Sequence, residues 1–220
     1  MTSFILKIIA VITMLCDHVG YFILNQFSFM NYIGRLSFPI FAFLITEGYK
    51  HTKNLKKYIA RLLIFAIISQ LPYMLFINTF SNSFSLNILF TLALGLLGIT
   101  LYDKIEYKPL GILLVTLLSL IAQFLHFDYG WFGIATIFIF YIFKEKKLLM
   151  NLFFCIVVFI NYFYIYLITS RIEYLFIILS CSLSLIPINL YNEKKGKDMK
   201  YFLYVFYPLH LIVLYLFSLI

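Results

Sequence analysis

Apolar segments as long as a membrane-spanning helix recur along almost the whole chain. A helix needs about 20 mainly apolar residues to cross the hydrocarbon core of a bilayer. Nine segments fit this description: 4–24, 32–50, 55–77, 85–103, 108–126, 129–143, 147–168, 172–191 and 200–219. Only 12% of the 220 residues are charged, against about 25% in soluble domains. The sequence therefore predicts an all-α polytopic bundle of about nine transmembrane helices, which forms a single integral membrane domain over residues 1–220.

Positive charge is concentrated in alternate connections between these segments. Fifteen of the seventeen Lys and Arg residues fall on one side of the predicted bundle, and the exceptions are Arg35 and Arg171. Lys and Arg collect in the cytoplasmic loops of membrane proteins, so we expect a cytoplasmic N-terminus and an external C-terminus. This orientation signal also explains the net charge of +8. We infer that the chain contacts the lipid bilayer and does not bind a nucleic acid.

Only a few charged residues and histidines lie at membrane depth. They are Asp17, His18, Arg35, Glu47 and His210, with Gln70 and Asn87 as uncharged polar members of the same group. A charge inside a span costs a few kcal/mol, and such residues usually face the protein interior and mark function. Asp17 and His18 are neighbours, so their side chains point about 100° apart on a helix. From depth alone, we expect Asp17 to pair with Arg35, and His18 to contact His210 or a substrate.

Structural interpretations compete with these functional ones. Asp17 and Arg35 would also suit a purely structural ion pair, and either histidine would suit a hydrogen-bonded core position. Glu47 lies near the basic connection, where a salt bridge at the cytoplasmic edge is the favoured interpretation. The cluster from Lys50 to Arg61 is most simply a topology signal, with anionic lipid or cofactor binding as the alternative. The histidines are scattered without metal-ligand spacing, so we predict no metal site.

Five blocks in order resemble the TraX family of membrane proteins. They read LKIIAVITMLCDHVG (6–20), IGRLSFPIFAFLITEGYKHTKNLKKYIARLLIFAIISQLPY (33–73), NILFTLALGLL (87–97), YGWFGIATI (129–137) and YFLYVFYPLHLIVL (201–214). The family's namesake is associated with N-terminal acetylation of conjugative pilin, and the family resembles small, distant relatives of multi-span acyltransferases. The matching positions are Asp17 and His18 of the DH motif, Arg35 of GR, Glu47 of EG and His210 of PLH.

The resemblance implies a membrane acetyltransferase in the bacterial plasma membrane. It would move an acetyl group from cytoplasmic acetyl-CoA to an amine or hydroxyl of a peptide, glycan or lipid at the outer side. Acyl transfer needs a base and a stabilised oxyanion. We expect His18 to act as the base or as a transient acyl carrier.

Three groups of residues are assigned by this hypothesis. Asp17 would hold Arg35 or raise the basicity of a nearby ring, most plausibly His210, and Arg35 or Asn87 would donate to the oxyanion. The expected binding site for the acetyl-CoA phosphates is the set Lys50, Lys53, Lys56, Lys57 and Arg61. The expected substrate pocket is the set Glu47, Gln70, Asn87 and Tyr207.

Two other functions remain open at the level of sequence. Intramembrane Asp and His residues also suit a proton-linked transporter or channel, although no inverted repeat is evident. A non-enzymatic membrane assembly protein is the second alternative. It would tolerate Asp17→Asn and His18→Ala as long as it folds, whereas an enzyme would lose turnover.

Overall fold

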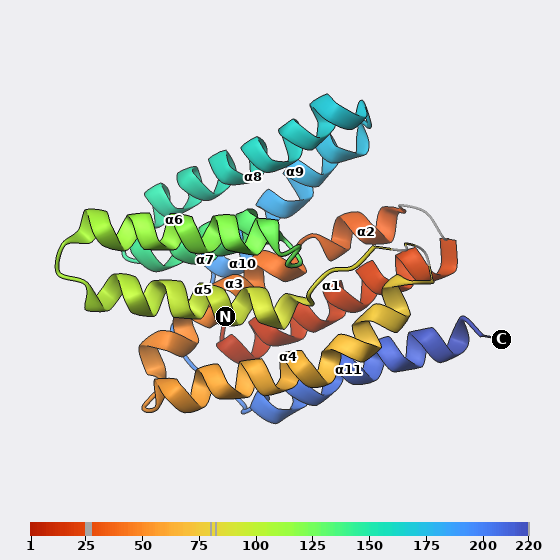
Figure 1. Ribbon diagram of the computed structural model, residues 1–220, viewed down its shortest axis with the longest axis horizontal. Helices are drawn as coiled ribbons and strands as arrows, with labels where there is room; N and C mark the ends of the chain where they lie inside the picture. Colours follow the sequence, from red (N-terminus) through yellow and green to blue (C-terminus); the bar gives the residue numbers. More distant parts are fainter. Residues whose placement is uncertain (25–27, 80, 82, 220) are drawn as a thin grey trace.

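The computed structural model describes residues 1–24, 28–79, 81 and 83–219, and the described chain is helical (Figure 1). Within these ranges the only β-type pairing is an isolated bridge between Leu86 and Phe127. The helices are α1 (Ser3–Leu24), α2 (Phe29–Gly34), α3 (Ser37–His51), α4 (Leu55–Ile77), α5 (Ile88–Lys104), α6 (Lys108–Phe124), α7 (Gly130–Ile142), α8 (Lys147–Thr169), α9 (Glu173–Leu183), α10 (Leu185–Asn189) and α11 (Lys200–Phe217).

Each of the nine predicted segments contains helix, but two of them are broken. Segment 32–50 divides into α2 and α3 at Arg35 and Leu36, and segment 172–191 divides into α9 and α10 at Ser184. A proline follows each break, at positions 39 and 187. Proline has no N–H to donate to the carbonyl four residues earlier, so each helix loses a hydrogen bond at the point where it breaks.

Four helical stretches within the described residues are long and apolar enough to cross a membrane: 3–22, 29–51, 55–77 and 147–169. The stretches 108–124, 130–142, 173–189 and 201–217 are shorter apolar helices. The structure therefore has the helices of a transmembrane protein, while the nine-span count and the inside–outside orientation stay predictions.

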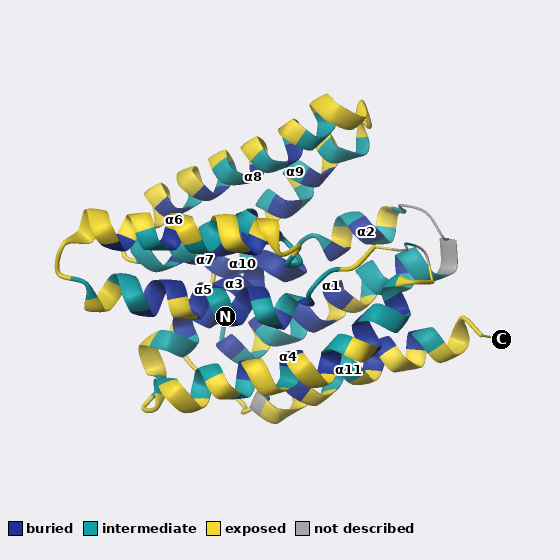
Figure 2. Ribbon diagram, viewed as in Figure 1, coloured by how far each residue is buried: buried dark blue, intermediate teal, exposed yellow. Residues whose placement is uncertain are grey.

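The outer surface is apolar along most of the helix lengths. Figure 2 shows exposed residues on the outward sides of α4, α6, α8 and α11, and buried residues toward the middle. On α4 the exposed side chains include Ile64, Ile67 and Leu71, and on α6 they include Leu113, Leu120 and Phe124. Apolar surface of this extent is rare on a soluble monomer, so it fits a lipid environment.

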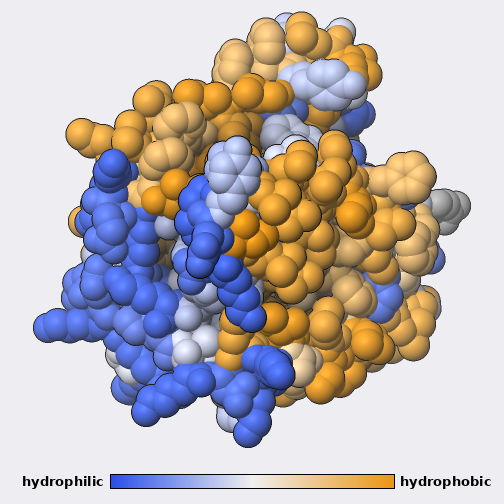
Figure 3. All heavy atoms as spheres, turned by 60° about the vertical axis from the view of Figure 1, so that its left-hand side comes forward, coloured by the Kyte–Doolittle hydropathy of each residue, from blue (hydrophilic) through white to orange (hydrophobic). Residues whose placement is uncertain are grey.

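Hydrophilic side chains gather at one end of the molecule (Figure 3). Contacts link the connections there: Lys144 pairs with Glu47, Lys50 lies 3.7 Å from Glu145, and Lys147 Nζ donates to the Asn189 carbonyl. We call this the basic end, formed by the connections 50–56, 104–108, 143–147 and 190–200. The opposite or far end carries the connections 28–36, 78–87 and 125–129, of which the last two are joined by a hydrogen bond from Leu86 N to His126 O.

Candidate functional site

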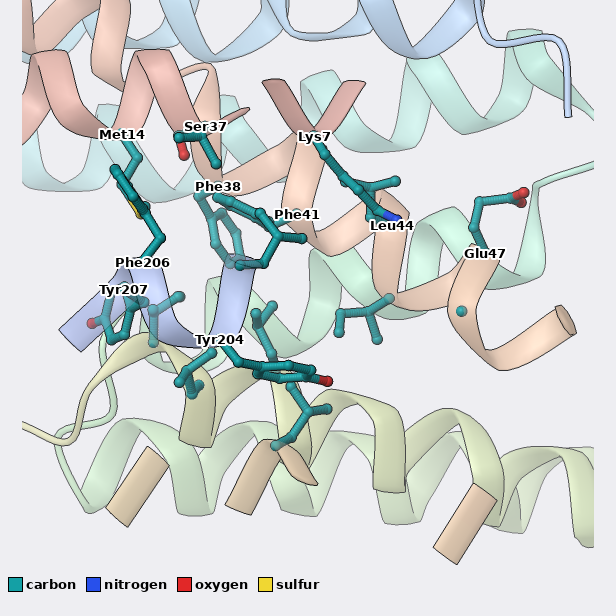
Figure 4. A pocket seen from close by; sticks show the side chains of 18 of the residues that line it. Lys7, Met14, Ser37, Phe38, Phe41, Leu44, Glu47, Tyr204, Phe206 and Tyr207 are labelled. Carbon is teal, nitrogen blue, oxygen red and sulfur yellow. The ribbon is translucent and has the colours of Figure 1, made fainter. Parts of the chain in front are cut away.

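One cavity of about 790 Å³ extends between the two ends, with walls from α1, α3, α4, α5 and α11. Polar side chains line it at the far end: Asp17, His18, Tyr21, Arg35, Asp128 and Tyr129. Its middle is apolar, with Met14, Phe38, Phe41, Leu44 and Phe206 (Figure 4). Charged side chains line it again at the basic end: Lys7, Glu47, Lys53, Arg61, Lys195 and Asp198. The cavity thus joins two polar regions through an apolar passage.

The two predicted histidines meet at the far end. His18 Nδ1 lies 2.7 Å from His210 Nε2, and the rings are nearly parallel, with an interplanar angle of 10°. His210 Nδ1 lies 2.8 Å from the Phe206 carbonyl oxygen. His18 lines the cavity, whereas His210 lies behind it and is buried.

These contacts determine where the ring protons lie. A carbonyl oxygen only accepts, so His210 Nδ1 must carry the proton of that bond. Burial favours neutral rings, and a neutral His210 then accepts at Nε2 from His18 Nδ1–H. The remaining nitrogen, His18 Nε2, carries a lone pair and no proton. The geometry therefore gives the ring that lines the cavity the form of a base.

Asp17 and Arg35 form the other predicted pair. Arg35 Nη2 lies 3.1 Å from Asp17 Oδ1 and donates to the Tyr21 hydroxyl at 3.1 Å. The break between α2 and α3 places Arg35 there, and Gly34 permits the approach because a Cβ at that position would collide with the Asp17 side chain. The hydrogen-bond contacts of the His210 ring nitrogens are with His18 and with the Phe206 carbonyl.

Asn31 is a member of this network that sequence reasoning missed. It is fully buried, and its Nδ2 donates to the Asp17 carbonyl at 2.8 Å and to Asp17 Oδ1 at 3.1 Å. Its Oδ1 accepts from Ser28 N at 2.7 Å and from Ser28 Oγ at 2.9 Å. A Ser-x-x-Asn spacing before a short helix was the available signal, since such a spacing resembles a capping box. Asn31 thereby fixes the Asp17 carboxylate.

Asp128 is the second residue that was missed. It lies in the connection between α6 and α7, half-buried on the cavity wall. Burial raises the pKa of the Asp128 carboxyl from 3.8 to about 7, although the nearby Arg35 charge opposes the rise. Its backbone N–H donates to the Leu86 carbonyl at 2.8 Å. The only sequence signal was an acid in a connection free of Lys and Arg.

Two of the predicted pocket residues do not line the cavity. Asn87 Nδ2 donates to the Ala66 carbonyl and to Gln70 Oε1, both at 2.8 Å, and Gln70 Nε2 donates to the Ser85 carbonyl at 2.8 Å. Asn87 also caps α5 through Leu89 N. Because both amide protons of Asn87 are used, the structure does not support it as an oxyanion donor, and the pair instead joins α4 to α5.

The other two pocket residues lie on the wall. Tyr207 is buried there near the far end, and Glu47 lies toward the basic end. Glu47 pairs with Lys144 and lies 3.6 Å from His51 Nε2. Glu47 therefore forms salt-bridge contacts at the basic end, and a cytoplasmic position for that end stays a prediction.

The expected phosphate-binding cluster divides into two groups. Lys53 and Arg61 line the cavity, whereas Lys50 points to Glu145, and Lys56 and Lys57 are exposed away from the lining. The structure adds two cations from other elements, Lys7 of α1 and Lys195 of the connection before α11. Among the described residues, no group of three or more His, Cys, Asp or Glu side chains is placed to hold a metal ion.

Comparison with known proteins agrees with the motifs. The family described as TraX protein matches residues 3–218. The chain belongs to the TraX family. A protein of Dichelobacter nodosus is described as "Probable fimbrial assembly protein FimC, serogroup H1". It is 30% identical to this chain over a 238-residue alignment, which covers 97% of this chain and 94% of that protein. An uncharacterized protein of Rickettsia prowazekii (strain Madrid E) is 32% identical over 91 residues, covering 41% of this chain and 34% of that protein. No solved structure matches this TraX-family chain.

Proposed function

We propose that this protein is a membrane-embedded acyltransferase in which His18 is the general base. The observation that carries the proposal is the hydrogen-bonded series from the Phe206 carbonyl through His210 to His18. It leaves an unprotonated Nε2 on a ring that lines the cavity. A positioned imidazole base typically contributes about 10²–10⁴-fold to a rate.

The acyl donor would enter from the basic end. Lys7, Lys53, Arg61 and Lys195 line the cavity there and would bind the phosphates of acetyl-CoA by charge-assisted hydrogen bonds. Lys7 and His18 are on the same helix, separated by roughly 16 Å at about 1.5 Å per residue. The apolar passage between them would hold a flexible thioester arm and keep water from the reacting carbonyl.

The transfer would proceed in two steps. An acceptor N–H or O–H gives its proton to His18 Nε2 while its nitrogen or oxygen bonds to the thioester carbonyl carbon. The carbonyl oxygen becomes an oxyanion, which the Arg35 guanidinium stabilises. The C–S bond then breaks, and the thiolate takes the proton from His18 Nε2. His210 stabilises the transient imidazolium by accepting the Nδ1–H bond, and Asp17 holds Arg35 in place.

The predicted orientation assigns a side to each substrate. With a cytoplasmic N-terminus, the basic end faces the cytoplasm, where acetyl-CoA would be supplied, and the far end faces outward. The membrane would be the bacterial plasma membrane, and the acceptor a peptide, glycan or lipid at its outer side. The name of the Dichelobacter relative favours an acceptor or partner that belongs to a fimbria.

The same name supports a second candidate, a membrane assembly protein without enzymatic activity. That function requires the helices but not the lone pair on His18. The end-to-end cavity also suits a proton-linked transporter, for which solute flux across sealed vesicles would replace turnover as the activity.

Free CoA release tests the proposal. Wild-type protein and His18→Ala are reconstituted into vesicles with acetyl-CoA outside and candidate acceptors inside. His126→Asn is the matched control, because His126 is exposed at the far end and does not line the cavity. We expect turnover in the wild type and the control, and at least a 100-fold loss in His18→Ala. Equal rates in wild type and His18→Ala would reject His18 as the base, and no CoA release from the wild type would reject the acyltransferase.

A further inference from the structure

Helix α8 diverges from the bundle as it runs away from the basic end. Figure 1 shows α8 and its packing partner α9 rising away from α6 toward the connection 170–172. Of the four long apolar stretches, 147–169 is the least buried, with 17% of its apolar part inside the structure against 33% to 56% in the others. The divergence uncovers a part of α8 that would otherwise pack on the bundle.

One face of α8 changes from buried to exposed along the helix. Alternating steps of four and three residues place six positions on this face: 150, 154, 157, 161, 164 and 168. Met150 and Phe154 are 2% and 0% exposed, and the ring centroids of Phe154 and Phe140 of α7 are 5.0 Å apart. Further along the same face, Tyr164 and Ile168 are 63% and 64% exposed. We call these six positions the α8 face.

Asn161 lies on the α8 face, between its buried and its exposed part. It is half-buried, and within the part of the chain that the structure describes its side-chain amide forms no hydrogen bond. At about 1.5 Å per residue, it lies roughly 21 Å along a helix about 33 Å long, which is within the apolar depth of a bilayer. An amide in hydrocarbon is costly without a hydrogen-bond partner, and lipid tails offer none.

The other asparagine of α8 shows the contrast. Asn151 accepts a hydrogen bond from Asn189 Nδ2 at 3.1 Å, and this bond joins α8 to α10 within the chain. The fold thus provides a partner for the amide near the start of α8, but not for the amide of Asn161. The partner of Asn161 must therefore come from outside the chain.

We propose that the α8 face binds the same face of a second copy of this chain, with the two Asn161 amides hydrogen-bonded to each other. Two copies inserted in the same orientation are related by a two-fold axis along the membrane normal. Their α8 helices then run parallel, so position 161 meets position 161 at the same depth. This dimer does not depend on the proposed acyltransferase function.

The chemistry of the α8 face favours a second copy over other occupants. An amide carries both a donor and an acceptor, so two identical asparagines can each donate to the other. Hydrogen bonds between polar side chains of this kind join helices in membranes. None of the six positions is charged, so two copies of the face do not repel each other. Tyr164 and Ile168 supply exposed apolar surface beside the amide.

Association in a lipid bilayer tests the dimer. Full-length protein is labelled on a C-terminal tag with a donor or an acceptor fluorophore and reconstituted into neutral-lipid vesicles over a range of protein-to-lipid ratios. Energy transfer then measures the fraction of dimer. The variants are Asn161→Leu, which keeps the size of the side chain without the amide, and Asn161→Gln, which keeps the amide. Asn151→Leu is the matched control, because the Asn151 amide has its partner within the chain.

We expect the wild type to dimerise, and Asn161→Leu to associate about 3–10-fold more weakly, since two modest interhelical hydrogen bonds are lost. Asn161→Gln should retain most of the association, and Asn151→Leu should match the wild type within about two-fold. A wild type that stays monomeric at every ratio, or an Asn161→Leu variant that associates as tightly as wild type, would overturn the proposal. An equal loss in Asn151→Leu would also overturn it.

Cysteine cross-linking distinguishes the α8 face from the other exposed side of the helix. The background is full-length protein in which the three native cysteines are replaced by alanine, and the oxidant is copper–phenanthroline. Tyr164→Cys should form a disulfide-linked dimer, because a disulfide needs Cα atoms within about 7 Å. Phe159→Cys should stay monomeric, since Phe159 is 49% exposed but points about 140° away from position 164. Cross-linking of Phe159→Cys in place of Tyr164→Cys would overturn the assignment of the interface to this face.

Discussion

Two carboxylates, half-buried Asp17 and buried Glu47, lie toward opposite ends of the cavity and serve different purposes. Asp17 at the far end receives hydrogen bonds from Arg35 and Asn31 and precedes His18, whose Nδ1 contacts His210. Glu47 at the basic end pairs with Lys144 and lies close to His51, among connections that carry many charges. Asp17 holds a cation on the cavity wall, whereas Glu47 joins α3 to the connection between α7 and α8. The difference lies in what surrounds each pair.

The largest expected effect comes from breaking the far-end pair. Arg35→Met leaves the Asp17 carboxylate buried without its cation, and removing one partner of a buried pair costs about 3–5 kcal/mol. We expect CoA release to fall by at least 100-fold, together with a lower melting temperature. The melting temperature in detergent and the rate in vesicles measure the two effects. An active, stable Arg35→Met protein would contradict the functional role that separates the Asp17–Arg35 pair from the Glu47–Lys144 pair.

His210 tests whether the proton arrangement at the far end matters. His210→Phe keeps a ring of similar size but removes the acceptor for His18 Nδ1–H, so the unprotonated nitrogen of His18 is no longer fixed at Nε2. We expect about a 10–100-fold loss of turnover, less than the roughly 10²–10⁴-fold contribution of a positioned base, because His18 itself remains. The Michaelis constant for acetyl-CoA should not change, because His210 lies behind the cavity wall. A change confined to that constant would contradict the prediction.

Substitutions at the basic end should weaken the binding of acetyl-CoA and leave the rate of the chemical step unchanged. Lys7→Gln and Lys195→Gln remove cations from the cavity wall, while Lys56→Gln removes an exposed one that lies off the wall. We expect the Michaelis constant for acetyl-CoA to rise several-fold in the first two variants and to stay unchanged in the third. Equal effects in all three would indicate a general attraction of anions to this end.

A further expected effect is a pH-dependent gain of stability in Asp128→Asn. The pKa of Asp128 rises from 3.8 to about 7 on folding, so the folded state binds more protons than the unfolded state between these values. The contribution of Asp128 to the stability of the wild type therefore falls as pH rises through this window. Asparagine does not titrate, so the melting temperature of Asp128→Asn relative to wild type should increase from pH 4 to pH 7 and then level off. A difference in melting temperature between Asp128→Asn and wild type that stays constant from pH 4 to pH 7 would contradict this prediction.

The positions of the helices were largely predictable from the chain itself. Segments such as 55–77 and 147–168 carry long apolar runs, and the structure has helices at Leu55–Ile77 and Lys147–Thr169. The two breaks were not predicted, because an apolar run does not show where a backbone carbonyl loses its partner. Prolines 39 and 187 were visible in the sequence, but Pro72 and Pro208 lie inside continuous helices.

The sequence determined which residues are costly at membrane depth, and tertiary structure decided what each of them does. Depth was enough to predict the contacts of Asp17 with Arg35 and of His18 with His210, because a charge or polar ring in a span must find a partner. Depth was not enough for Asn87 and Gln70, which satisfy each other away from the cavity. Asn31 reaches Asp17 from a short helix, and Asp128 reaches the cavity end from a connection. The positions of both segments depend on contacts distant in the chain. Local composition fixes the cost of a polar group, whereas only the folded arrangement fixes its partners.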